Sequence, residues 1–87
     1  MANTVGGQLD EMAQLARILD SNGSQAQQIR SAIDRTLAGT TWTGPAADRF
    51  RDSWAQFSPS LDKLREALAE AGREVEQRRR ALEQATS

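Results

Sequence analysis

Apolar residues recur at steps of three or four through almost the whole chain, and this spacing predicts two long helices. In the first half the step averages about 3.5 residues, which is the period of a helix that packs along a seam. The positions that follow this period, one of them polar, are Val5, Leu9, Met12, Ala16, Leu19, Asn22, Ala26, Ile29 and Ile33. We therefore predict a first helix over about residues 7–38.

Two features of this first helix affect how it is interpreted. Leu15 and Ile18 widen the apolar stripe beyond what one neighbouring helix would cover, which indicates contact with more than one helix. The turn-forming run Asp20–Ser24 interrupts the pattern and could divide the segment into two helices. Because the apolar phase carries across this run, we favour one continuous helix with a weak or slightly bent middle.

The second half is the most regular part of the sequence and predicts a helix over about residues 45–84. Its apolar positions alternate between steps of three and four, as the a and d positions of heptads do, with Arg78 as the one polar member. The series is Ala47, Phe50, Trp54, Phe57, Leu61, Leu64, Leu68, Ala71, Val75, Arg78, Leu82 and Ala85. Pro59 lies inside the helix, and we expect a kink or local opening near residues 55–58.

Between the two helices lies a corner, residues 40–45, that contains Trp42, Gly44 and Pro45. Gly39 suits a left-handed helix cap, and Pro45 is favoured in the first turn of the second helix. We predict a single all-α domain over residues 1–87, an antiparallel helix-turn-helix hairpin. One such hairpin cannot cover its own apolar stripes, so we expect it to dimerise into a four-helix bundle.

Composition supports association with another chain. A chain of 87 residues is marginal as a monomer, and it has no Cys or His for a disulfide or zinc staple. Its net charge of −1 gives no attraction for nucleic acid or an anionic membrane. The start of the chain, residues 1–7, has neither a cationic nor an apolar run, so we expect no cleaved signal peptide and no transmembrane segment.

The side chains offer little for catalysis, and we predict that the protein is not an enzyme. It lacks His, Cys and Tyr. The i,i+4 carboxylate pairs are off the heptad seam, where water solvates them, so we expect no metal or cofactor. We interpret the arginines at 73 and 78–80 as a helix end whose guanidinium groups pair with Glu74, Glu76 and Glu83. Arg78, at a core position, could select a partner that offers a carboxylate.

All four aromatic residues fall within sixteen positions beside the corner. We expect Phe50 and Phe57 to lie in the core, and we leave open whether Trp42 and Trp54 form a docking surface. The residues predicted to form the core or the dimer interface are Leu9, Met12, Leu15, Ile18, Leu19, Ile29, Ile33, Phe50, Trp54, Phe57, Leu61, Leu64, Leu68, Val75 and Leu82.

The run from Trp42 to Phe50, with Trp54 and Phe57 beyond it, resembles the WXG family, the small ESAT-like substrates of type VII secretion systems, in its actinobacterial branch. The resemblance covers the whole chain. It implies a hairpin that dimerises head to tail, is cytoplasmic before export and is secreted folded without a cleaved signal peptide. It also implies that the corner, through Trp42 and Gly44, lies beside a Tyr-containing tail of the partner, and that the two together are recognised by the secretion ATPase.

This chain departs from the family pattern because it contains no Tyr. We therefore prefer a heterodimer in which another WXG-family hairpin supplies the tail, with a homodimer as the alternative. A different function is also open: a cytosolic adaptor or chaperone-like hairpin whose Leu15, Ile18 and Ile29 bind a larger toxin or effector. Membrane disruption by a dissociated amphipathic helix is a third possibility, against which the balanced charge argues.

Overall fold

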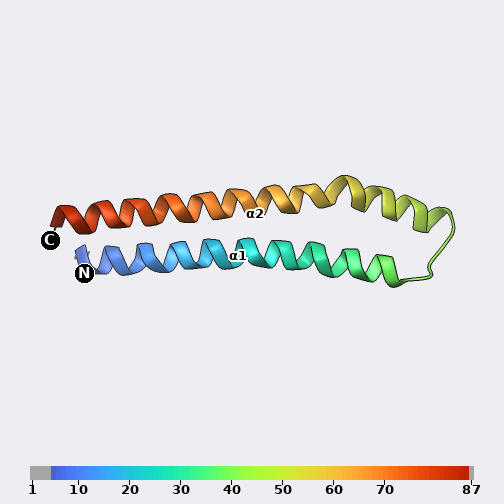
Figure 1. Ribbon diagram of the computed structural model, residues 1–87, viewed down its shortest axis with the longest axis horizontal. Coiled ribbons are helices and arrows are strands. Elements are labelled where there is room, and N and C mark those ends of the chain that lie inside the picture. Colours follow the sequence, from blue (N-terminus) through green and yellow to red (C-terminus); the bar gives the residue numbers. More distant parts are fainter. Residues whose placement is uncertain (1–4, 87) are drawn as a thin grey trace.

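The computed structural model describes residues 5–86 and shows two long antiparallel helices joined at one end (Figure 1). Helix α1 spans Val5–Gly39 and helix α2 spans Pro45–Thr86. The prediction of an all-α antiparallel hairpin is confirmed. The expectation of no signal peptide rests on the start of the chain, of which residues 1–4 lie outside the described residues. Residue 87 lies outside them as well.

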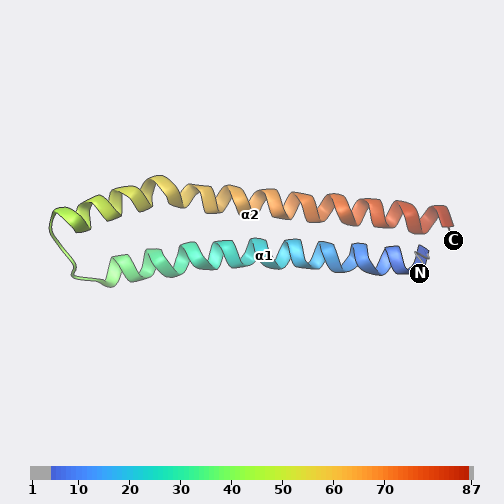
Figure 2. The same cartoon turned by 180° about the vertical axis from the view of Figure 1, so that it is seen from behind.

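The molecule is a rod and not a globule. It measures 64 × 19 × 18 Å, and its radius of gyration is 19.5 Å, against about 12 Å for a compact domain of this length. The view from behind shows the same two-layer arrangement, in which each helix has only the other as a neighbour (Figure 2). A hairpin of this shape leaves most of each helix surface uncovered.

Helix α1 is continuous through the turn-forming run Asp20–Ser24, as we favoured from the apolar phase. Within this run, Gly23 is buried against α2. A Cβ atom placed there would stand 3.4 Å from the backbone oxygen of Arg65 and 3.6 Å from the Cβ of Leu68. Gly23 therefore lies in the contact between the two helices, where a methyl group would make ordinary contacts, and the segment does not turn.

Helix α2 passes through Pro59 without a break. Figure 1 shows its axis bending away from α1 in the yellow part of the ribbon, which agrees with the predicted kink. Ser58, directly before the proline, is buried at 3% exposure. At its far end the helix continues to Thr86, two residues beyond the predicted end, and the Thr86 hydroxyl donates to the Leu82 carbonyl oxygen at 2.9 Å.

The corner differs from the prediction at Gly39. This residue stays helical, and the glycine with positive φ is Gly44, at 110°. Thr40 N–H closes the end of α1 by donating to the Leu37 carbonyl oxygen at 3.4 Å. The left-handed cap at Gly39 was therefore wrong, because the chain leaves α1 in an extended path and reverses only at Gly44, directly before Pro45.

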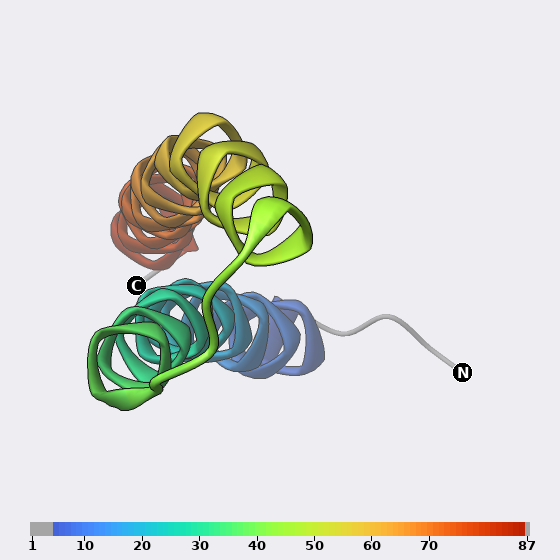
Figure 3. The same cartoon turned by 90° about the vertical axis from the view of Figure 1, so that its right-hand side faces the viewer.

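The two helices cross at a shallow angle and wind about each other in a left-handed sense, as seen along the rod (Figure 3). This winding is what heptad spacing imposes on packed helices. The most deeply buried residues along the seam are all small, which lets the two backbones approach closely. They are Gly23, Ala26, Ala47, Ser58 and Gly72.

Candidate interaction surface

Trp42 lies in the corner outside both helices and is 45% exposed. Its ring tilts against that of Phe50, with ring centroids 6.0 Å apart and the planes at 50°. Its carbonyl oxygen accepts a hydrogen bond of 2.9 Å from Nη1 of Arg51. The indole is thus supported from the first turns of α2 while half of its surface stays open to solvent.

Gly44 sets the direction in which the chain enters α2. Its φ of 110° lies in a region that residues with a Cβ atom rarely adopt. Its carbonyl oxygen accepts the first helical hydrogen bond, from Asp48 N–H at 3.0 Å, so Gly44 is the N-cap. Pro45 follows as the first helical residue, where its missing N–H costs nothing.

Trp54 has a different environment and lies half-buried between the helices. Its indole Nε1–H donates to Oδ1 of Asp34 at 2.7 Å. Arg30 holds that carboxylate from one turn away, at 3.4 Å, and also pairs with Asp62 of α2. Because its indole bonds from α2 across to Asp34 of α1, Trp54 belongs to the helix–helix contact, whereas Trp42 is the more exposed of the two tryptophans.

The inward-facing row of α2 differs from the predicted series at several positions. Ser58 and Gly72 are buried, whereas Phe57 and Leu64, in the predicted row, are exposed by 54% and 47%. Within one hairpin Phe50, 45% exposed, and Phe57 are therefore not core residues. The sequence pattern favoured the larger apolar side chains, whereas close contact between two helices favours the small ones.

The exposed large side chains gather on one side of the hairpin. Phe50, Phe57 and Leu64 are seven residues apart and so form a line along α2, and Leu15 and Ile29, fourteen apart, form a line along α1. A groove of about 310 Å³ joins the two lines, since Leu15 and Met12 share it with Ala71, the next member of the α2 row.

We call this surface the apolar face. Leu15, Ile29 and Leu64 are 47%, 52% and 47% exposed. Ile18, at 46%, lies further round α1. An unpaired stripe of this kind along a helical hairpin is typical of a protein–protein interface.

The predicted interface residues thus fall into two groups. Six of them are exposed: Leu15, Ile18, Ile29, Phe50, Phe57 and Leu64. The other nine are half-buried along the seam between the helices: Leu9, Met12, Leu19, Ile33, Trp54, Leu61, Leu68, Val75 and Leu82.

Sequence reasoning included Ala26 and Ala47 in the apolar rows but missed the other small seam residues, above all Gly23 and Gly72. A Cβ atom at Gly72 would stand 3.4 Å from the Ala16 carbonyl oxygen and 3.7 Å from the Cβ of Leu19. The available signal was a glycine inside a helical pattern whose apolar phase continues across it, because such a glycine often marks a close contact.

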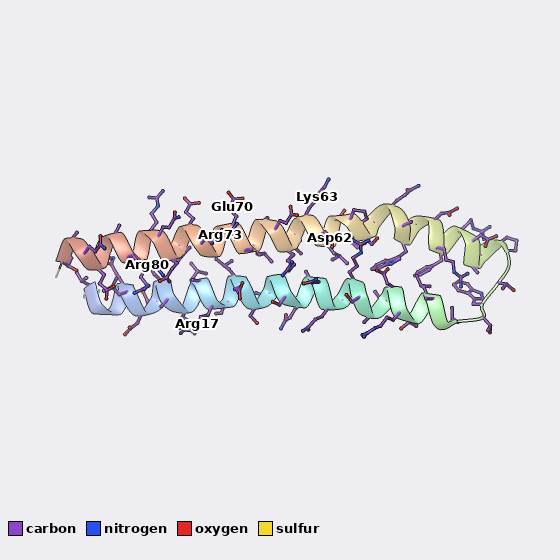
Figure 4. All side chains as sticks on the ribbon, viewed as in Figure 1. Arg17, Asp62, Lys63, Glu70, Arg73 and Arg80 are labelled. Carbon is purple, nitrogen blue, oxygen red and sulfur yellow. The ribbon has the colours of Figure 1, made fainter. Side chains whose placement is uncertain are left out.

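Charged side chains cover the outer surface and the end of α2 away from the corner. Figure 4 shows Lys63 and Glu70 pointing away from α1. Near the end, Glu74 pairs with Arg78 at 3.3 Å and Glu76 with Arg80 at 3.5 Å, as predicted. Arg78 is therefore an exposed member of a surface ion pair, at 72% side-chain exposure.

Arg79 is the best-held cation of this end. It pairs with Glu76 through more than one hydrogen bond and with Glu83 at 3.6 Å. The hydrogen bonds from Arg79 lower the pKa of Glu76, and those to Glu76 raise the pKa of Arg79. The cluster stabilises the helix end, and its charges are satisfied internally.

No three acidic side chains in residues 5–86 come together as metal ligands. Neither α1 nor α2 is long and apolar enough to cross a membrane.

Fold and surface together define a small all-α helical-hairpin protein with an aromatic corner and one exposed apolar face. Residues 7–87 match the family described as "Proteins of 100 residues with WXG", and the chain belongs to this WXG100 family. Its members are non-enzymatic secreted proteins, generally substrates of type VII secretion, and they typically pair with another WXG protein. No curated protein and no solved structure matches the chain significantly.

Proposed function

We propose that this protein is a substrate or co-substrate of a type VII secretion system, acting as a dimer that presents Trp42 and Gly44 to the secretion ATPase. Family membership supports the secretion role. The exposed indole at the corner supports the presentation of Trp42, because a half-exposed tryptophan on a rigid support is a strong anchor for a partner.

The observation that carries the dimer is the apolar face. No large side chain among the described residues is fully buried, whereas Phe57 and Ile29 are more than half exposed. The chain exposes 6402 Å², and a compact monomer of its mass would expose about 5,000 Å². The excess exceeds the roughly 800 Å² that each partner buries in an interface of standard size.

The preferred partner is a second WXG-family hairpin, packed on the apolar face to complete a four-helix bundle. The 87 residues contain no Tyr, so we assign the Tyr-containing tail beside the corner to that partner. In this arrangement the chain is cytoplasmic before export and leaves the cell as part of the folded complex.

The dimer is tested by the mass of the purified chain in solution, with and without the co-expressed product of its neighbouring small gene. We expect the mass of a complex of two hairpins. Replacement of Phe57 and Leu64 by Ser should abolish it, because both side chains lie on the apolar face. Gln77→Ser, on the same helix but outside that face, is the control. A double variant that still dimerises would contradict the assignment.

Presentation of the corner is tested by export. Trp42→Ala should remove the protein from the culture medium while leaving the dimer intact. Thr41→Ala, a neighbouring exposed corner position, should be exported as the parent is. Normal export of the Trp42 variant would refute the proposed role of the corner.

The adaptor role remains the second candidate, and the exposed Leu15, Ile18 and Ile29 of α1 favour it. Ile18 lies at the edge of the apolar face, where a second hairpin covers it least. Capture of one large protein by the chain, lost on Ile18→Ser and accompanied by no export, would support this role over secretion.

A further inference from the structure

The corner has almost no backbone hydrogen bonds of its own. Outside the helices, the described residues show two such bonds, and both lie at helix ends: Thr40 to Leu37, and Asp48 to Gly44. Neither involves Trp42. A non-helical segment without backbone bonds has little local stability, so the position of Trp42 must come from side chains.

Two consecutive residues of α2 supply this support. Phe50 lies against the indole ring, and Arg51 donates from Nη1 to the Trp42 carbonyl oxygen at 2.9 Å. The bond spans nine sequence positions, from the second turn of α2 back to the corner. The ring and the backbone of Trp42 are therefore both held by side chains of α2.

The place of Arg51 in the helix makes it suited to this role. It occupies the inward-facing row of α2, seven residues before Ser58, and is half-buried. Its long side chain lets the guanidinium reach the corner. Arg49, two positions earlier, is exposed and makes no hydrogen bond or ion pair with any described residue.

We propose that Arg51 is a positioning residue for Trp42: its guanidinium fixes the corner backbone so that the indole is presented in one orientation. This inference deepens the proposed function, since an anchor that is already ordered loses less entropy when a partner binds it. Arginine suits the task because its planar group is preorganised, so less freedom is lost for each hydrogen bond formed.

The test uses the chain labelled with 5-fluorotryptophan, alone and in complex with an unlabelled partner, and follows both tryptophans by ¹⁹F NMR. Arg51→Met keeps much of the apolar stem and removes the donor. Loss of one hydrogen bond should reduce the ratio of held to released corner about fivefold. The Trp42 resonance should then narrow and move towards that of free fluorotryptophan, while the Trp54 resonance, fixed by Asp34, stays in place.

Arg51→Lys, which retains one donor group, should restore part of the shift, and Arg49→Met should leave both resonances unchanged. An unmoved Trp42 resonance in a folded Arg51→Met protein would overturn the proposal. If that variant loses its helical circular dichroism, the lysine variant decides the matter, because a parent-like Trp42 resonance there would show that the guanidinium geometry is not needed.

Export separates this inference from the proposed function. We expect Arg51→Met to be exported several-fold less than Arg49→Met. If Trp42→Ala is exported normally, the secretion role of the corner fails, while the resonance of Trp42 still reports whether Arg51 positions it. If the resonance moves and export does not, the positioning is real but has no part in secretion, which overturns the functional half of the inference.

Discussion

At the scale of single residues, backbone geometry distinguishes two glycines that look equivalent in the sequence. Gly39 and Gly44 flank the same corner, and neither has another atom within 4 Å of an added Cβ. They differ in conformation, because Gly44 alone has a positive φ, of 110°. The difference lies in the path of the chain, which no local residue preference encodes.

Gly44→Ala should therefore destabilise the protein by about 1–3 kcal/mol, because an alanine would be held in a strained backbone conformation. Gly39→Ala should leave stability unchanged or raise it by up to about 1 kcal/mol, since alanine is the better helix residue. Urea denaturation of the two variants beside the parent measures this difference. Equal stabilities of the two variants would show that a side chain at position 44 causes no backbone strain.

Acid stability should depend on Glu76. The pKa of its carboxyl is lowered, first by the hydrogen bonds from Arg79, so its contribution is complete above the usual glutamate pKa. It is lost as the pH falls from that value through the lower folded pKa. The raised pKa of Arg79 matters only in strong alkali.

Glu76→Gln should accordingly flatten the fall in melting temperature between neutral pH and about pH 3, relative to the parent. Glu70→Gln is the matched control, because Glu70 points into solvent and pairs with no described residue (Figure 4). A parent-like acid profile for the Glu76 variant would contradict the link to this ion pair.

At the scale of the helices, the heptad pattern predicted two long antiparallel helices and their continuity. It also predicted the shared row from Ala47 to Leu82. The heptad pattern could not decide which second row of α2 faces α1, the row of Phe57 or that of Ser58. Phe57 and Ser58 are adjacent, and Ser58 lies in the same buried row as Gly72, where α2 closely approaches α1. The sequence predicted which apolar residues form the candidate surface. It did not predict which of them lie in the seam and which lie on the apolar face.

The glycines in the seam between the helices allow a quantitative prediction about helix packing. At 3.4 Å from the Ala16 carbonyl oxygen, a Cβ atom at Gly72 makes an ordinary contact. Gly72→Ala should therefore keep the fold and add up to about 1 kcal/mol from helix propensity. Gly72→Leu should cost about 1–3 kcal/mol by overpacking the seam. Thermal unfolding of both variants tests the sign, and a stabilising leucine would disprove the close contact.

At the scale of the whole molecule, the rod by itself leaves much of its large apolar surface exposed. Its most deeply buried side chains are small, and the large ones are shared between seam and apolar face. A protein that is stabilised by a partner has a melting temperature that rises with concentration. The melting temperature of this hairpin should therefore rise with the concentration of its partner.

We expect the melting temperature of the parent, with its partner in equal amount, to rise over a hundredfold range of concentration. The Phe57→Ser, Leu64→Ser double variant should melt lower and show no such rise, because it cannot associate. Circular dichroism at both ends of the range provides the measurement. A concentration-independent parent would indicate that the hairpin is stable alone.

The apolar face also has a consequence for the amount of protein in the cell. An unpaired copy exposes a line of phenylalanine, leucine and isoleucine side chains along its length. Chaperones and proteases act on chains that spend time unfolded, and small changes in stability alter abundance several-fold. Unpaired copies would then be degraded first, so the level of this protein would follow that of its partner even when its own synthesis is constant.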